Sequence, residues 1–354
     1  MSEQKVIICK QMDKEVTDFL AAISYDKVFI LTDTNTHEQC YPLVKQIAPL
    51  REAPVLTLEA GDTHKSLEQI AAVWEALSSG GASRKSLLVN LGGGMVTDLG
   101  GFAAATFKRG IRTINIPTTL MGSVDAAVGG KTGFNFHGLK NEIGAFWVPE
   151  CVFINCEFLR TLDRDNFLSG YAEMMKHALI SSIDDYISIF LFDPDAKMDY
   201  SFLGKMVERS VAVKERIVAE DPKEEGIRKA LNFGHTVGHA LESLSFAQNR
   251  PVLHGHAVAA GLVAELYLSH KLCGFPMDKL SQVVYYIKNY YRPIPFTCDD
   301  YDRLYELMTH DKKNVSGQIR FTLLAQIGDV KMDQSVGKEK ILESLDFYRE
   351  SFGF

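Results

Sequence analysis

The sequence predicts an α/β protein with two parts. An amino-terminal Rossmann-like parallel-sheet domain is expected over residues 1–164, and a mostly α-helical carboxy-terminal domain over residues 165–354. Short apolar runs alternate with helical segments up to about residue 150, which is the pattern of a parallel sheet. Beyond residue 165, helix-period segments dominate and contain two histidine motifs, GHTVGH and HGH. The second domain is therefore the candidate metal-binding domain.

Length and composition exclude several classes of protein. The 354 residues are enough for two domains, and 23% charged with 46% hydrophobic residues is usual for a soluble enzyme. A net charge of −7 argues against a nucleic-acid or anionic-membrane partner. No apolar run reaches membrane-spanning length, and residues 1–10 do not resemble a signal peptide. Six cysteines without C-x-x-C spacing indicate reduced thiols, so we expect a cytoplasmic protein.

The first half supplies four apolar runs that we expect to be strands. They span residues 28–32, 55–58, 86–91 and 111–116, and helices are expected after the first run, up to residue 50, and over residues 67–77. Asp33 and Asn35 follow the first run, at the strand end where parallel sheets bind ligands. Capping of the next helix is an equally good interpretation of both residues.

A triple glycine follows the third run. Gly92, Gly93 and Gly94 begin the pattern G-x-G-x-x-T, and the small-residue segment LGGFAAATF comes after it. Glycines at a strand-to-helix junction let backbone amides approach a pyrophosphate, and the positive end of the helix stabilises the anion. The pattern has threonine where the dinucleotide motif prefers glycine or alanine, so a simple tight turn is the alternative.

Residues 123–146 are expected to form a glycine-rich loop. It carries Asp125, Lys131, Lys140 and Asn141. Lysines among glycines can bind phosphate or carboxylate groups as point charges, and ordinary solvated lysines are the alternative.

The second half is expected to be helical over residues 167–180, 202–219, 228–245, 258–271 and 280–290, with a strand at 319–324. His235 and His239 stand four residues apart, so both imidazoles leave one face of a helix. His254 and His256 follow closely, and neutral imidazole is a good zinc ligand. The alternative is that one histidine caps a helix, one is buried and hydrogen-bonded, and two lie on the surface. Glu173 lies among apolar residues and is the candidate carboxylate ligand, with a helical salt bridge to Lys176 as the alternative.

Seven motifs together resemble the 3-dehydroquinate synthase family of the sugar-phosphate cyclase superfamily. They occur in the family's order, at nearly its spacings, and cover almost the whole chain. The motifs are GGGMVTD (92–98), VDAAVGGKTGFN (124–135), LKNEIGAF (139–146), AEMMKH (172–177), LNFGHTVGHALE (231–242), LHGH (253–256) and HDKKN (310–314).

The resemblance implies a set of ligands and site residues. A divalent metal, zinc with cobalt as the alternative, is expected on Glu173, His235 and His254, with His239 in proton transfer. The positions that match the substrate pocket are Asp125, Lys131, Lys140, Asn141, Lys176, Lys214, Arg228, Asn232 and one or both of Lys312 and Lys313. The positions that match NAD contacts are Asp33, Asn35, Asp62, Lys65, Gly93, Gly94, Asp98, Thr118, Thr119, Lys131, Lys140 and Thr161. Arg109 matches a residue that reaches the partner subunit's phosphate pocket, which implies a homodimer.

The implied substrate is a phosphorylated sugar acid, 3-deoxy-D-arabino-heptulosonate 7-phosphate, and the products are 3-dehydroquinate and phosphate, in the shikimate pathway to aromatic amino acids. Transient oxidation by NAD allows phosphate elimination, after which the hydride returns and an intramolecular aldol step closes the ring. A sister cyclase would lack cations for the substrate carboxylate, and a polyol dehydrogenase would release NADH. A catalytically silent NAD-binding or scaffold protein would show gaps in the site.

Four positions depart from the family pattern. His256 stands where most relatives have glutamate, Asp62 replaces another glutamate, and Thr97 replaces a glycine. Glu142 stands where an apolar residue is commoner. His256 matters most, because it can compete as a metal ligand or pack beside the site; we expect His254 and not His256 to bind the metal.

Overall fold

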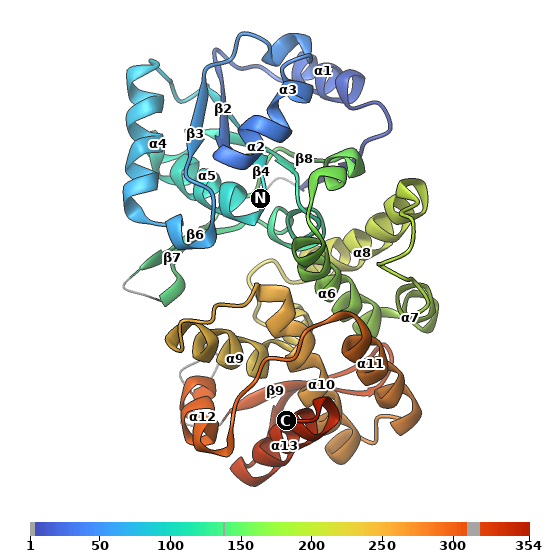
Figure 1. The fold of residues 1–354 in the computed structure, drawn as a ribbon. Helices are drawn as coiled ribbons and strands as arrows, with labels where there is room; N and C mark the ends of the chain where they lie inside the picture. Colours follow the sequence, from blue (N-terminus) through green and yellow to red (C-terminus); the bar gives the residue numbers. More distant parts are fainter. Residues whose placement is uncertain (1–3, 137–138, 310–318) are drawn as a thin grey trace. The chain divides into compact units, whose positions relative to one another are not determined.

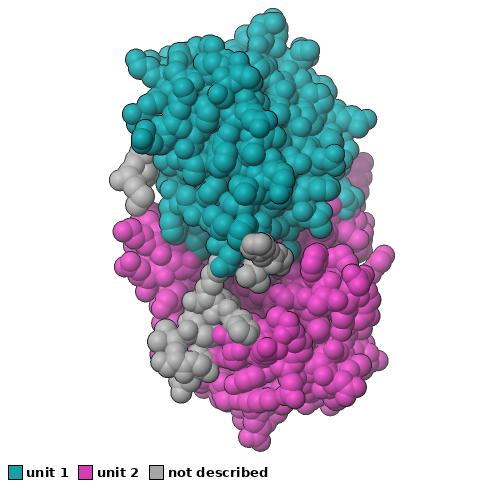
Figure 2. Space-filling view, turned by 90° about the vertical axis from the view of Figure 1, so that its left-hand side faces the viewer, with its two compact units in different colours: residues 1–163, 200–211 teal, residues 164–199, 212–354 magenta. Residues whose placement is uncertain are grey.

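The computed structural model describes residues 4–136, 139–309 and 319–354. The chain divides into two compact units, shown in different colours in Figure 2. Unit 1 comprises residues 1–163 and 200–211, and unit 2 comprises residues 164–199 and 212–354. The first part of one long helix, residues 200–211, thus joins the amino-terminal unit, whereas the sequence was expected to divide once, after residue 164.

Unit 1 is built on a six-stranded sheet in the order β1-β8-β5-β4-β2-β3, and all of its strand pairs are parallel. The strands are β1 (Lys5–Ile8), β2 (Val28–Asp33), β3 (Val55–Leu58), β4 (Leu87–Gly92), β5 (Arg112–Pro117) and β8 (Cys151–Ile154). Four of these are the predicted strands. β1 and β8 were not predicted from the sequence.

Helices cover both faces of this sheet (Figure 1). On one face, α1 (Met12–Ala22) and α3 (Tyr41–Val44) pack against Ile30 and Val89. On the other face, α4 (Leu67–Ser79) and α5 (Gly94–Thr106) pack against Leu31 and Leu88. Neighbouring residues of one strand thus enter opposite cores, which explains why the strands are apolar runs and not alternating patterns.

The helix expected to run up to residue 50 is instead three short pieces. They are α2 (Thr34–Gln39), α3 and a 3-10 helix at Ala48–Leu50. Pro42 and Pro49 each stand in the first turn of a new piece. Proline lacks the amide needed inside a helix but fits its first turn, so each proline ends one helix and begins another.

The prediction of a loop over residues 123–146 is wrong for most of this segment. A π-helical turn at Gly122–Ala126 is followed by an antiparallel hairpin, β6 (Lys131–Phe136) with β7 (Leu139–Phe146). Gly133 and Gly144 are paired across this hairpin, and a Cβ at Gly133 would lie 2.6 Å from the Ile143 carbonyl oxygen. These glycines allow the two strands to approach closely. From the sequence alone, the same glycines indicated a loop.

Unit 2 is mainly helical. Its helices are α6 (Arg164–Ser181), α7 (Ile183–Phe190), the end of α8 (Tyr200–Glu220), α9 (His235–Ala247), α10 (His254–Cys273), α11 (Met277–Tyr290), α12 (Tyr301–Thr309) and α13 (Lys338–Phe352). A hairpin, β9 (Arg320–Gln326) with β10 (Asp329–Ser335), lies beside them. Helix α10 is the centre of the unit, because it packs against α6, α9, α11, α13 and β9 (Figure 1).

The single helix expected over residues 228–245 is wrong at its start. A 3-10 helix spans Ile227–Asn232, and α9 begins only at His235. Between them Gly234 takes a left-handed conformation with φ of +80°, which glycine adopts far more readily than other residues. The break places His235 in the first turn of α9.

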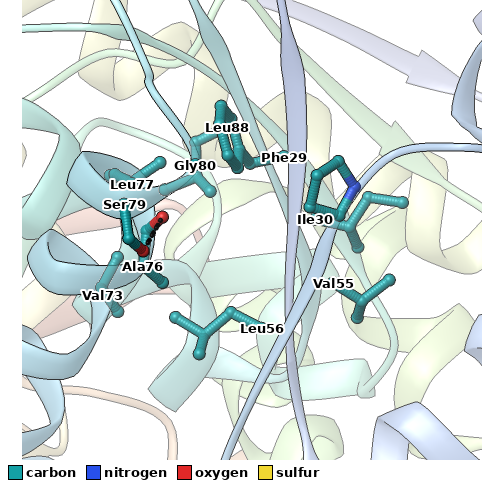
Figure 3. A pocket seen from close by; sticks show the side chains of 11 residues that line it. Phe29, Ile30, Val55, Leu56, Val73, Ala76, Leu77, Ser79, Gly80 and Leu88 are labelled. Carbon is teal, nitrogen blue, oxygen red and sulfur yellow. Dashed lines mark hydrogen bonds between the residues drawn. The ribbon is translucent and has the colours of Figure 1, made fainter.

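A pocket of about 320 Å3 lies in unit 1 at the amino-terminal ends of β2, β3 and β4 (Figure 3). Its lining includes Phe29, Val55, Val73 and Leu77, and Ser79 uses its hydroxyl to donate to the Glu75 carbonyl oxygen. None of the predicted site residues lines it. Among the described residues, every helix is too short or too polar to span a bilayer.

Candidate active site

The candidate residues of unit 1 gather at the carboxyl edge of its sheet. Asp33 ends β2, Gly92 ends β4 and Pro117 ends β5, and these three strands are neighbours. Gly93 and Gly94, Thr118 and Thr119 follow the last two strands directly. Ligands of open parallel sheets bind at this edge, so the fold brings these predicted cofactor residues to one place.

The glycines form a backbone surface without side chains. Helix α5 begins at Gly94, and its N-cap, Gly93, has no side chain to satisfy the first amides. A Cβ on Gly93 would lie 2.9 Å from Thr119 Cγ2, and one on Gly94 would lie 3.1 Å from Ala126 Cβ. A helix start of this kind fits the pyrophosphate of a dinucleotide. The unusual Thr97 points its hydroxyl at the Gly94 carbonyl oxygen, 3.1 Å away, and is buried in the helix.

Asp33 acts as a helix cap in this structure. Its Oδ1 accepts a hydrogen bond from the Thr36 amide at 2.8 Å, and the Thr36 hydroxyl accepts one from the Asp33 amide at 2.9 Å. Asn35 and Thr161 are exposed, and they follow β2 and β8 in the sequence. The capping interpretation of Asp33 is thus confirmed, and NAD binding by Asp33, Asn35 and Thr161 stays a prediction.

A buried lysine joins three segments of unit 1. Lys65 is 3% exposed, and its Nζ donates to Asp98 Oδ2 and to Asn141 Oδ1, both at 2.5 Å. Burial raises the pKa of Asp98, although the ammonium group of Lys65 opposes this. Exposed Lys140 pairs with Asp62 at 3.0 Å. The structure therefore places Asp62, Lys65, Asp98, Lys140 and Asn141 together.

Asn135 holds this group in place and was not predicted. Its backbone amide donates to the Lys65 carbonyl oxygen at 2.8 Å. Its side-chain Nδ2 donates to the Asp62 carbonyl oxygen at 2.9 Å, and its Oδ1 accepts from the Asn141 backbone amide at 3.0 Å. The β6–β7 hairpin is thus bonded to the turn at residues 62–65. The only sequence signal was its place at the end of the KTGFN motif.

In unit 2, Glu173 of α6 is completely buried. Its Oε1 lies 3.4 Å from His235 Nε2 and 3.6 Å from His254 Nε2, and its Oε2 forms an ion pair with Lys176. Neither oxygen accepts a well-directed hydrogen bond from the described residues. Burial alone would raise the pKa of Glu173, but Lys176 and His235 outweigh it and hold the pKa well below its usual value. Glu173 is therefore ionised.

Three imidazoles gather beside this carboxylate. One ring nitrogen from each of His235, His239 and His254 lies within 4.8 Å of the others. His235 Nδ1 lies 3.1 Å from the Phe233 carbonyl oxygen, so Nδ1 carries the hydrogen and Nε2 carries the lone pair. Burial and the charge of Lys176 lower the pKa of His235 to about 4, which keeps it neutral. Imidazole and carboxylate donors of this kind suit zinc.

The pKa of His254 is shifted in the opposite direction to that of His235. Burial lowers its pKa, but the carboxylates of Glu242 and Glu173 reverse this and raise it to about 10. In the metal-free protein His254 is therefore an imidazolium group. A metal that binds there must displace this proton.

Glycines and one buried glutamate fix the helices that carry these ligands. Glu265 of α10 is completely buried; its Oε2 accepts from the Gly234 amide at 2.7 Å and its Oε1 from the Val237 amide at 3.0 Å. It satisfies amides at the start of α9, where a negative charge is favourable. Gly255 leaves no room for a Cβ against the Ser169 backbone of α6. Sequence reasoning missed Glu265, because no local pattern connects it to α9.

His256 lies outside the histidine cluster. Its Nε2 lies 3.2 Å from the Asp165 carbonyl oxygen, and its ring packs against Tyr291 with centroids 5.3 Å apart. Burial lowers its pKa. This placement supports His254 as the ligand of the HGH motif, although metal binding itself stays a prediction.

The predicted cations of unit 2 are buried. Lys176, Lys214 and Arg228 are each exposed by 6% or less. Arg228 Nη1 donates to the Pro222 carbonyl oxygen at 2.7 Å, and Asn232 Nδ2 donates to Glu224 Oε1 at 2.8 Å. Lys312 and Lys313 lie outside the described residues.

Three further predicted residues lie in unit 1. Asp125 stands in the π-helical turn, and Lys131 is exposed at the start of β6. Arg109 is exposed after α5, in a turn where Lys108 and Arg109 both have positive φ, of 50° and 68°.

Comparisons with known proteins identify the family. The family models "3-dehydroquinate synthase N-terminal" and "3-dehydroquinate synthase C-terminal" match residues 55–169 and 170–314. A curated 3-dehydroquinate synthase from Parabacteroides distasonis is 71% identical over 353 residues, which cover 100% of both chains.

Two solved structures share the fold. A 2-deoxy-scyllo-inosose synthase complexed with carbaglucose-6-phosphate, NAD+ and Co2+ is 22% identical, with a TM-score of 0.84 over 98% of this chain and 96% of its own. A 2-epi-5-epi-valiolone synthase from Streptomyces hygroscopicus with NAD+ and Zn2+ bound is 23% identical, with a TM-score of 0.84 over 99% and 98%. From the sequence matches, the chain belongs to the 3-dehydroquinate synthase family, and it is an enzyme with that family's activity.

Proposed function

We propose that Glu173, His235 and His254 bind one zinc ion in unit 2, with cobalt as the alternative metal. The observation that carries this proposal is the position of Glu173, a buried, ionised carboxylate whose Oε1 lies within 3.6 Å of both imidazole Nε2 atoms. Three protein ligands leave a coordination position open for substrate. His239 belongs to the same cluster, and we assign it to proton transfer, so its removal should leave the metal in place.

NAD is proposed to bind at the carboxyl edge of the unit 1 sheet. The amides at the start of α5 bind the pyrophosphate, and Gly93 and Gly94 keep side chains away from it. The remaining contacts are assigned to Asp33, Asn35, Asp62, Lys65, Asp98, Thr118, Thr119 and Thr161. Lys131 and Lys140 match both cofactor-binding and substrate-binding positions of the family. Support for this assignment comes from the glycine surface and from the fold's two NAD-bound neighbours.

When bound, NAD accepts and returns a hydride, and the divalent metal polarises the hydroxyl being oxidised. The chain's own side chains bind and orient the substrate. Buried Lys176, Lys214 and Arg228, with Asn232, hold the carboxylate and phosphate of 3-deoxy-D-arabino-heptulosonate 7-phosphate. His239 moves a proton during phosphate elimination. Three buried cations favour this substrate over the sugar phosphates of sister cyclases, which carry a phosphate but no carboxylate.

We further propose a cytoplasmic homodimer that acts in aromatic amino acid biosynthesis. Arg109 is exposed, as a residue that reaches a partner subunit's phosphate pocket has to be. Two successive residues with positive φ make the turn at 107–109 costly to form, which is a reason to expect a function for it.

One assay separates cyclisation from simple dehydrogenation. Purified protein is incubated with the heptulosonate phosphate, zinc and substoichiometric NAD, and phosphate, 3-dehydroquinate and NADH are followed together. We expect phosphate and 3-dehydroquinate to form in equal amounts over many turnovers, while NADH does not accumulate. Growth of NADH in step with product would refute the mechanism. Faster turnover of sedoheptulose 7-phosphate would indicate a sister cyclase.

A further inference from the structure

A second buried carboxylate contacts the candidate metal site. Glu242 lies on α9 and is 5% exposed, and its Oε2 lies 3.1 Å from Nδ1 of His254, the first residue of α10. A carboxylate only accepts hydrogen bonds, so Nδ1 is the donor. The motif that ends in Glu242 drew attention for its histidines, and neither the sequence nor the family match assigned this glutamate a role.

The contact determines which nitrogen of His254 is available. With Nδ1 as donor, the ring presents Nε2 toward Glu173 Oε1, 3.6 Å away. His235 is held in the same way, except that its Nδ1 bonds to a backbone carbonyl oxygen. Both proposed histidine ligands therefore have their Nδ1 fixed by an acceptor and their Nε2 directed to the same carboxylate oxygen.

His254 depends on this contact more than His235 does. The side chain of His254 is 33% exposed, against 11% for His235, so packing restrains its ring less. The side chain of Glu242, on α9, is only 6% exposed, so packing restrains it more than it restrains His254. A fixed acceptor beside a loosely packed imidazole selects one ring orientation before a metal arrives. When a metal displaces the Nε2 proton, the hydrogen bond to Glu242 keeps the remaining hydrogen on Nδ1.

We propose that Glu242 is a positioning residue for the metal centre. It orients His254 so that Nε2 becomes the ligand, and its negative charge strengthens the ring as a donor. This inference rests on the proposed metal ligands, and it adds a residue that does not itself touch the metal. Loss of such a partner typically lowers metal affinity by about 10- to 100-fold.

The test compares zinc affinity in full-length variants by competition with a chromophoric chelator. We expect Glu242→Ala to weaken zinc binding about 10- to 100-fold. Glu242→Gln should recover most of the loss, because its amide oxygen accepts the same hydrogen bond. Glu339→Ala is the matched control, since it removes an exposed glutamate from α13 of the same unit and should bind zinc like the unchanged chain.

Two further measurements separate the possible outcomes. Thermal unfolding of the metal-free proteins shows whether Glu242→Ala damages the fold; an equal loss of zinc affinity in the Ala and Gln variants, or a loss explained by unfolding, overturns the positioning role. Long-range 15N NMR of the zinc-loaded chain should show His254 bound through Nε2, and Nδ1 ligation would also overturn it. If His254→Ala retains zinc, the proposed metal ligands are wrong. If His254→Ala loses zinc but Glu242→Ala binds it with full affinity, only the positioning role of Glu242 is wrong.

Discussion

The two candidate sites of this enzyme are built by different means. The unit 1 site consists mostly of backbone at strand ends, where Gly93 and Gly94 keep side chains away from a helix start. The unit 2 site consists of buried ionisable side chains, with Glu173 on α6, His235 on α9 and His254 on α10. Backbone geometry is set locally by the strand-turn-helix sequence, whereas the second site exists only after three helices have packed.

The difference has an energetic consequence. In unit 2 the buried charges of Glu173 and Lys176 depend on one another, and removal of one partner leaves an uncompensated buried charge, which is strongly destabilising. In unit 1 the exposed Asp62–Lys140 pair contributes about 0–1 kcal/mol, since solvent screens it. Changes in unit 2 should therefore affect metal, fold and activity together, and changes at the unit 1 edge should affect cofactor affinity more selectively.

The largest effect is expected for the metal ligand itself. We expect the unchanged protein to retain about one zinc ion per chain. His254→Ala should abolish this retention and lower kcat about 1,000-fold, because Lewis-acid assistance contributes several kcal/mol. His256→Ala is the control, because His256 bonds to the Asp165 carbonyl oxygen and lies outside the histidine cluster. Zinc content by elemental analysis checks both, and stoichiometric zinc in His254→Ala would contradict the ligand set.

The next effect tests the backbone site of unit 1. Gly94→Val should raise the dissociation constant of NAD about tenfold or more, since a Cβ there already meets Ala126 at 3.1 Å and a branched side chain blocks the approach to the helix start. Zinc binding in unit 2 should not change. Isothermal titration with NAD measures the effect. Gly337→Val serves as the control, because its added Cβ meets nothing within 4 Å; equal affinity in both variants would mean that the cofactor lies elsewhere.

A third prediction concerns the frame of the metal site. Glu265→Ala leaves the buried amides of Gly234 and Val237 without their acceptor, so the free energy of unfolding should fall by about 1–3 kcal/mol. Glu265→Gln should lose less, because its amide oxygen still accepts one bond. Urea unfolding of the metal-free chain, followed by circular dichroism, measures the loss. Stability equal to that of Glu339→Ala would show that the start of α9 needs no buried carboxylate.

The contrast between local backbone features and long-range side-chain contacts also explains which parts of the two sites could be predicted from the sequence. The apolar runs of unit 1 identified four strands and the glycine junction, because each feature is contained in a few consecutive residues. In unit 2 the histidine spacing and the apolar surroundings of Glu173 identified the candidate ligands. Glu265 was missed because its bonds reach residues 28 and 31 positions away, and no periodicity encodes such a pair.

Glycine was the residue most often misread. Gly234 stood inside an expected helix, yet its left-handed conformation ends one segment and starts another. Gly133 and Gly144 suggested a loop, yet they face each other in a hairpin. A glycine signals that a side chain would not fit, but only the fold shows whether the reason is a turn, a paired strand or a neighbouring helix.

The smallest effect separates two roles for one residue at the unit 1 edge. Asp33 caps α2 through the Thr36 amide, and it is also predicted to bind NAD. Asparagine caps helices as well as aspartate does, so Asp33→Asn should leave the free energy of unfolding nearly unchanged, whereas Asp33→Ala should lower it by about 1 kcal/mol. A hydrogen bond to a charged acceptor is about 1 kcal/mol stronger than one to a neutral acceptor, so Asp33→Asn should weaken NAD binding by several-fold to about tenfold. Unchanged NAD affinity in the asparagine variant, measured beside its stability, would leave capping as the role of Asp33 and remove it from the cofactor site.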